Sequence, residues 1–239
     1  MKPYREEGTK KEQVREMFDN IAPTYDTLNH TLSAGIDRRW RRRTVSIVQR
    51  CNPQRAADIA AGTGDLTIAL AKAMPQCRVT GIDLSEGMLR IAREKAAGEG
   101  LDGRVEFVCG DAERLDFGDG GFDAVTVAFG VRNFGDITAG LREICRVLRS
   151  GGMVAILELS VPGNPVIRWL YGLYSHFVMP LLGGAVSRDR AAYRYLPESV
   201  EEFPAPDKFL NILVEAGFDG CKYKSLTFGT ARIYTGVKP

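Results

Sequence analysis

Short apolar runs alternate with helical patterns through most of this chain. The runs that read as strands are RAADIA, RVTGID, RVEFVCGD, FDAVTVAFG and GMVAILELS, and the amphipathic stretches between them cover residues 65–73, 85–97 and 137–148. Alternation of this kind predicts an α/β fold, in which a parallel sheet is connected by right-handed crossover helices on both of its faces.

The two ends of the chain follow other patterns. Apolar residues at 14, 17, 18 and 21 predict a short helix, and residues 23–48 are most simply two helices broken near Gly35. Near the C-terminus, a helix at 206–216 precedes two β-rich runs whose short connection suits only antiparallel neighbours. We therefore expect a helical lid over residues 1–50, a ligand-binding domain over 51–239, and an insertion at about 161–204 that covers the strand ends.

Composition narrows the class of protein. The 239 residues, 44% of them hydrophobic and 26% charged, are enough for one large domain with a real core. A net charge of +2 disfavours a strongly basic nucleic-acid binder. The five cysteines lie far apart and there are only two histidines, so neither a disulfide framework nor a metal site is expected. This cysteine usage, and an N-terminus without the apolar run of a signal peptide, predict a cytoplasmic protein.

A glycine turn follows the first strand and predicts a ligand site. Gly62 and Gly64 supply two glycines of a dinucleotide fingerprint, but Thr67 stands at the third position. Asp65 follows at the point where a pyrophosphate needs positive potential. A ligand with an ammonium and a sulfonium meets no such repulsion, which favours S-adenosylmethionine over a nicotinamide dinucleotide. A tight turn with positive φ would explain the glycines without any ligand.

Two further acids stand at strand ends. Asp83 closes the second strand, where a carboxylate can accept both hydroxyls of a ribose. Asp111 follows the third strand and can accept from an adenine amino group, while the Ala112 N–H donates to a ring nitrogen. Each acid alone could be a helix cap, and Met88 could pack on a purine or simply in the core. Acids at successive strand ends beside a glycine turn indicate a nucleoside cofactor.

Longer stretches resemble a known family. DIAAGTGDLTIALA, GIDLSEGMLRIAREK, GDAERLDF and RVLRSGGMVAILELS resemble class I S-adenosylmethionine-dependent methyltransferases. MFDNIAPTYDTLNHTLSAGIDRRWR, VAFGVRNFGD and AAYRYLPESVEEFP are similar to the menaquinone/ubiquinone biosynthesis C-methyltransferases, and the likeness runs from about Val14 to Lys238. One departure is Ala60, where the wider class often has glycine. The resemblance implies a Rossmann-like, seven-stranded, mostly parallel sheet with a terminal antiparallel strand. The cofactor contacts expected from turn, acids and resemblance are Gly62, Thr63, Gly64, Asp83, Asp111 and Ala112.

The implied reaction is methylation of a ring carbon in a polyprenylated quinol, with demethylmenaquinol as the leading candidate. Arg132, after the fourth strand, would stabilise a phenolate or poise a water, although a surface ion pair would also explain it. Asn133 would orient a quinol oxygen, and Tyr25 and Asp26 are weaker candidates from the lid helices. This chemistry requires no metal. His30 and His176 are expected to be packed or surface histidines.

Several alternatives remain open at this stage. The enzyme could also accept a polyprenyl benzoquinol, act on another lipophilic ring or on nucleic acid, or be a non-catalytic cofactor-binding subunit of a membrane-associated assembly. The apolar segment 164–186 predicts either an interfacial or tail-binding segment, in peripheral contact with the inner face of the cell membrane, or a helix that covers the pocket. The basic run 37–43 could meet anionic head groups or be a solvated helix face. The sequence favours no oligomeric state.

Overall fold

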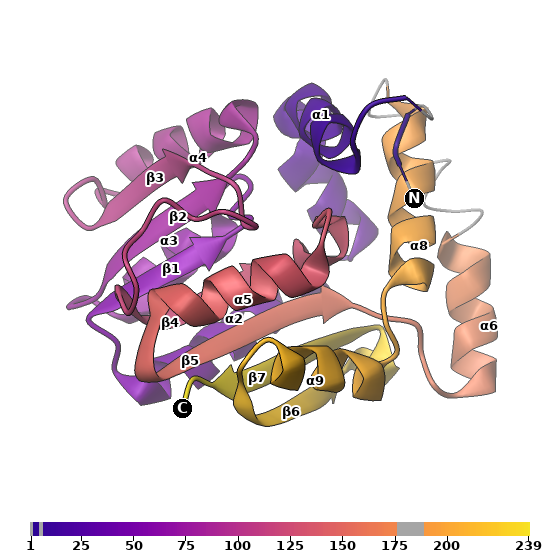
Figure 1. Ribbon diagram of the computed structural model, residues 1–239. Coiled ribbons are helices and arrows are strands. Elements are labelled where there is room, and N and C mark those ends of the chain that lie inside the picture. Colours follow the sequence, from indigo (N-terminus) through magenta and orange to yellow (C-terminus); the bar gives the residue numbers. More distant parts are fainter. Residues whose placement is uncertain (1, 5–6, 176–188) are drawn as a thin grey trace.

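A computed structural model describes residues 2–4, 7–175 and 189–239, and its centre is one seven-stranded sheet (Figure 1). The strand order is β3-β2-β1-β4-β5-β7-β6. The strands are β1 Arg55–Ile59, β2 Arg78–Asp83, β3 Val105–Cys109, β4 Phe122–Ala128, β5 Leu148–Leu159, β6 Asp219–Leu226 and β7 Ala231–Val237. The first five strands pair in parallel, whereas β7 runs antiparallel to both β5 and β6. The predicted α/β fold and its antiparallel closing strand are confirmed.

Helices cover both faces of the sheet. They are α1 Lys10–Leu32, α2 Ile36–Val48, α3 Asp65–Ala73, α4 Glu86–Gly98, α5 Ile137–Val147, α6 Pro165–Leu173, α8 Arg190–Glu202 and α9 Pro206–Glu215, with 3-10 turns at Gln49–Cys51, Val131–Asn133 and Thr227–Gly229. On β1, Ala57 and Ile59 pack toward α5 and α9, while Ala56 packs toward α2, α3 and α4. The sheet is therefore buried on both sides, as its near-continuous apolar strands require.

Helix α1 differs from the prediction. The helix expected to end near Ile21 continues to Leu32 and passes through Pro23. A proline inside a helix removes one backbone hydrogen bond, but the buried face of α1 continues from Ile21 to Leu28 and packs in one cluster with residues of α4 and α8. Tertiary packing thus outweighs the local cost. The predicted break near Gly35 is confirmed, since Gly35 has φ +74° and precedes α2.

The chain crosses to opposite faces of the sheet after its two central strands. The connection after β1 leads to α3 on one face, and the connection after β4 leads to α5 on the other. Neighbouring parallel strands that diverge in this way leave a crevice at their carboxyl ends, where α/β proteins bind ligands. In Figure 1 these ends point toward α1 and α8. Within the described ranges, the structure contains no helix that is both long and apolar enough to cross a membrane.

Candidate active site

A cleft of about 710 Å³ lies at the carboxyl ends of the central strands, and we call it the first cleft. Five of the predicted site residues line it: Gly62 after β1, Asp83 at the end of β2, Asp111 and Ala112 after β3, and Asn133 after β4. Residues that are distant in sequence meet here because parallel strands end at one edge of the sheet. The predicted convergence of the strand-end acids with the glycine turn is therefore present.

Asp83 holds the glycine turn from across the sheet. One carboxylate oxygen accepts a hydrogen bond from the Gly62 N–H at 2.8 Å, and the other accepts from the Ser85 N–H at 2.9 Å. Burial raises the pKa of Asp83, and these backbone donors oppose that rise. Each oxygen keeps a further lone pair, so this pair of acceptors fits the paired hydroxyls of a ribose.

Helix α1 reaches across the first cleft through two lysines that sequence reasoning did not single out. Lys11 Nζ lies 2.5 Å from an Asp111 carboxylate oxygen and 3.0 Å from Glu113. Lys10 Nζ donates to the carbonyls of Arg132 and Phe134, each at 2.9 Å. The first turn of α1 is thereby tied to the loops after β3 and β4. Consecutive lysines at the start of a helix carry no sequence signal for such a contact.

Thr63 and Gly64 are not among the residues that line the first cleft. The Thr63 hydroxyl is buried and donates to Asp26 of α1 at 2.5 Å. Gly64 has φ +81°, and a Cβ at this position would lie 2.9 Å from the Phe107 ring. Both residues shape the turn from behind, and the structure gives Asp26 the role of an anchor for Thr63.

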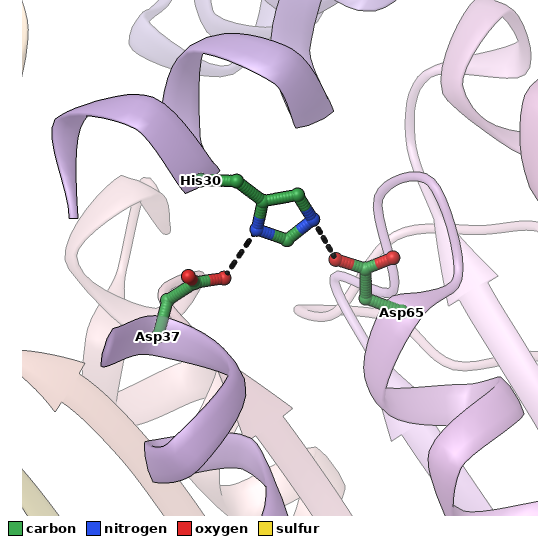
Figure 2. Close-up of side chains that lie close together, drawn as sticks. All are labelled: His30, Asp37 and Asp65. Carbon is green, nitrogen blue, oxygen red and sulfur yellow. Dashed lines mark hydrogen bonds and ion pairs between the residues drawn. The ribbon is translucent and has the colours of Figure 1, made fainter. Parts of the chain in front are cut away.

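The electrostatic argument from Asp65 is wrong. Asp65 does not line the first cleft and lies in a cluster of charged side chains, with Lys95 Nζ at 2.5 Å and His30 Nε2 at 3.6 Å. Figure 2 shows its approach to His30. Burial opposes its charge, but Arg41 and Lys95 hold the pKa of Asp65 below its usual range. A compensated carboxylate outside the cleft cannot repel a pyrophosphate within it. Asp83 disfavours a phosphate instead, because it occupies the Gly62 N–H.

The same cluster has the composition of a metal site. Ligand atoms of His30, Asp37 and Asp65 lie within 4.8 Å of one another, and Figure 2 shows the imidazole between the two carboxylates. Arg41 already forms an ion pair with Asp37, and Lys95 with Asp65. A divalent cation would have to compete with these two side chains. We therefore assign the cluster to the joining of α1, α2 and α3, with His30 as a bridge between two acids rather than a merely packed or surface histidine.

A second cleft of about 690 Å³ adjoins the first, and Tyr25 and Phe129 line both. Half of its other side chains are apolar or aromatic, and the rest are polar or charged. They include Leu32, Trp40, Leu159, Tyr171, Tyr174 and Leu196, together with Asp37, Arg41 and Arg132. The sequence had not separated this cleft from the first, because its walls come from α1, α2, α6 and α8.

Arg132 lines the second cleft and forms a buried ion pair, not a surface pair. Its Nη1 lies 2.6 Å from Glu158 and also donates to the Phe129 carbonyl, while Nε donates to Ser199 at 3.3 Å. Burial opposes the charge of Arg132, but Glu158 raises its pKa, so the guanidinium stays charged. No described residue accepts a hydrogen bond from Nη2. The arginine thus has donors left for a ligand.

Asn133 was predicted as a site residue from the sequence, whereas Glu158, which pairs with Arg132, was not. Asn133 accepts from the Tyr195 hydroxyl at 3.2 Å and donates to the Phe129 carbonyl at 3.4 Å, which orients its amide. Glu158, fully buried near the end of β5, was missed. An acid at the carboxyl end of an apolar strand was the signal that identified Asp83, and the same signal was present at Glu158.

Strained backbone lies on both sides of the crevice. Ala60 has φ +54° and Phe129 has φ +59°, values that favour glycine. A Cβ on Gly130 would lie only 2.4 Å from the Ala60 Cβ. Alanine is therefore tolerated at the position where the wider class often has glycine because residue 130 has no side chain.

The fold and the first cleft together define a class I S-adenosylmethionine-dependent methyltransferase. The chain belongs to the ubiE/COQ5 methyltransferase family, whose model matches residues 6–238. It is 44% identical to a demethylmenaquinone methyltransferase of Bacteroides fragilis, over 100% of this chain and 97% of that protein. It is 48% identical to the enzyme of the same name from Thermus thermophilus, over 93% of this chain and 100% of that protein.

A solved structure shares the fold at low sequence identity. An N-methyltransferase of Haemonchus contortus, solved in complex with phosphomonomethylethanolamine and S-adenosylhomocysteine, is 18% identical to this chain. The two superpose with a TM-score of 0.59, over 82% of this chain and 50% of that one.

The contact between Ala60 and Gly130 predicts a double-mutant effect. Gly130→Ala should destabilise the protein by about 1–3 kcal/mol, because the new methyl group overlaps Ala60. In an Ala60→Gly background the same change should cost at least about 1 kcal/mol less. Urea denaturation of the four proteins measures this coupling. Gly98→Ala, whose Cβ would have no neighbour within 4 Å, is the matched control. Equal costs in both backgrounds would contradict the packing argument.

The geometry of Asp83 predicts a loss of cofactor affinity. Asp83→Ala removes charged acceptors from the first cleft and should weaken S-adenosylmethionine binding by about 1–3 kcal/mol, roughly 5- to 150-fold. Isothermal titration calorimetry gives the affinity directly. The exposed Asp102→Ala variant should bind as the wild type does. Unchanged binding by the Asp83 variant would remove this residue from the cofactor site.

Proposed function

We propose that this methyltransferase converts demethylmenaquinol to menaquinol by methylating a carbon of the quinol ring. The observation that carries this substrate is the second cleft, an aromatic and apolar space that adjoins the first cleft and contains the buried cation of Arg132. A planar, apolar ring with an acidic hydroxyl matches that combination. The names of the relatives from Bacteroides fragilis and Thermus thermophilus support the same substrate.

The first cleft is proposed to hold the cofactor. Asp83 would accept the ribose hydroxyls, Asp111 and Ala112 would meet the adenine, and Gly62 would line the approach, with Thr63 and Gly64 supporting the turn from behind. S-Adenosylmethionine supplies an electrophilic methyl group when bound. Residues 1–50, which contain α1 and α2, would act as a lid, because Lys10 and Lys11 tie α1 across the cleft.

Arg132 and Asn133 would manage charge on the substrate. A quinol carbon becomes nucleophilic when the hydroxyl on the ring loses its proton. The free Nη2 of Arg132 can donate to the resulting phenolate, and the dry surroundings of the guanidinium strengthen that attraction. The guanidinium is already protonated and cannot take the proton itself, so a water held at Arg132 is proposed to accept it and pass it to solvent. The oriented amide of Asn133 would position a quinol oxygen.

The polyprenyl tail of this substrate would leave the cleft beside α6. Tyr171 of α6 lines the second cleft, while Val166, Trp169 and Leu170 of the same helix are 67%, 64% and 53% exposed. One helix thus joins the proposed ring site to an apolar outer surface, which supports a peripheral contact with the inner face of the membrane by a cytoplasmic enzyme. Residues 176–186 of the predicted tail-binding segment lie outside the described residues.

Methyl transfer by the purified protein tests this function. With S-adenosylmethionine, it should convert a short-chain demethylated naphthoquinol to a product heavier by one methyl group, as read by mass spectrometry. A short-chain benzoquinol assayed in parallel distinguishes a single from a dual substrate range. Asp83→Ala is the control with impaired cofactor binding. Cofactor binding without methylation of either quinol would refute the proposal and favour a non-catalytic subunit.

A substitution that keeps the charge tests Arg132. Arg132→Lys retains a cation opposite Glu158, and so avoids the cost of an unpaired buried acid. One ammonium cannot contact Glu158, Phe129 and a substrate oxygen with the planar geometry of a guanidinium. We expect at least a 100-fold loss of kcat with S-adenosylmethionine affinity within about two-fold of wild type, as measured by steady-state kinetics and calorimetry. Normal turnover would remove Arg132 from the mechanism.

A further inference from the structure

Phe129 combines three observations that the reaction outlined above does not use. It follows β4 directly, lines both clefts, and has a backbone φ of +59°. A bulky side chain in the left-handed region costs on the order of 1–3 kcal/mol, and such strain persists only where the surrounding structure maintains it. The cause of that conformation therefore lies in the neighbours of Phe129.

Hydrogen bonds on both sides of the residue hold this conformation. The Phe129 N–H donates to the Leu157 carbonyl of β5 at 2.7 Å. Its own carbonyl accepts from Arg132 Nη1 and, at 3.4 Å, from Asn133. The two residues proposed to act on the quinol thus also hold the Phe129 backbone. Hydrogen bonds to the Phe129 carbonyl thus connect the Arg132 and Asn133 side chains to the residue that carries the aromatic ring.

Contacts with α2 hold the ring of Phe129. The Arg41 guanidinium carbon lies 5.2 Å from the ring centroid, over one face of the ring. The Trp40 ring lies 6.2 Å away at an interplanar angle of 59°. Arg41 thus covers one face of the ring, and Phe129 still lines both clefts, so the residue remains accessible to a planar ligand.

We infer that Phe129 is the stacking surface that positions the acceptor ring in the second cleft beside the methyl donor. This inference rests on the proposed function, because it takes the quinol to be the occupant of the second cleft. The strained backbone sets the aromatic ring at the boundary of the two clefts. The free Nη2 of Arg132, which lines the second cleft, then meets an oxygen of a ligand stacked on the ring, while Asn133 lies on the side of the first cleft. The inference also specifies the acceptor class, since a flat bicyclic ring makes more contact with this face than a small aliphatic acceptor does.

Fluorescence of Trp40 provides a test that does not depend on turnover. The chain has two tryptophans, so Trp169→Phe leaves Trp40 as the only one. In this background, with S-adenosylhomocysteine present, 1,4-naphthoquinone should quench Trp40 saturably. Phe129→Leu should raise the dissociation constant of naphthoquinone at least ten-fold, with S-adenosylhomocysteine affinity within two-fold. Phe129→Asn, which tolerates the left-handed region, tests the loss of the ring with less backbone strain.

A matched control exists elsewhere in the chain. Phe228 also has a positive φ, at +56°, but is 79% exposed and lines neither cleft. Phe228→Leu should leave naphthoquinone binding unchanged. In the methylation assay, Phe129→Leu should lower kcat/KM for the quinol at least ten-fold while Phe228→Leu does not.

The outcomes separate the inference from the function on which it rests. Saturable quenching that Phe129→Leu weakens, without methyl transfer by the wild type, would refute the proposed reaction and still support Phe129 as the ring-binding surface. Equal naphthoquinone affinity in wild type and Phe129→Leu would overturn the inference, even if both proteins methylate the quinol. No saturable quenching in the wild type would overturn it as well.

Discussion

The divergence of the chain after two neighbouring parallel strands determines where this protein can bind anything. β1 and β4 lie side by side, yet α3 and α5 leave them on opposite faces of the sheet. These two connections therefore leave a crevice at the carboxyl ends of the strands, with polar groups at its edge and apolar side chains beneath. Asp83, at the end of the neighbouring strand β2, fixes the edge of this crevice, because its carboxylate accepts a hydrogen bond from Gly62 in the turn after β1. The position of the first cleft follows from topology, and its shape from a single hydrogen-bonded acid.

The second cleft depends on a different interaction, the buried pair of Arg132 and Glu158. Burying two charges costs free energy that their attraction often only balances, so such a pair is weak evidence for stability. Its value here is geometric. Glu158 binds Nη1 at 2.6 Å and also accepts from the Arg132 N–H at 3.3 Å, which holds both the side chain and its backbone. Under the proposed function, a charge that is already desolvated and oriented has little reorganisation left when a substrate anion forms beside it. The pair is better explained by chemistry than by folding.

Strand ends and turns could be predicted because they depend on local pattern. The order of strands and helices, the antiparallel closing strand and the meeting of Gly62 with Asp83 all follow from runs of residues that carry their own signal. Contacts made by one helix across another element could not be predicted in this way. Asp65 stands next to the glycine turn in sequence, but its partners His30, Arg41 and Lys95 come from three other helices. Their ion pairs hold the Asp65 carboxylate outside the first cleft. The continuity of α1 through Pro23 has the same cause, since packing against α4 and α8 decides it.

Strain at the crevice links the two clefts. Ala60 follows β1 and Phe129 follows β4, and both adopt left-handed backbone conformations on adjacent strands. Each such residue costs on the order of 1–3 kcal/mol, a large part of the stability of an ordinary domain. The two strained segments meet at Gly130, which has no side chain to separate them. Because the chain turns sharply after β1 and after β4, the backbone does not continue either strand into the crevice, and the Phe129 ring lies at the boundary of the two clefts. An extended backbone at these positions would continue each strand past its present end, so the left-handed turns are what redirect the chain at the crevice.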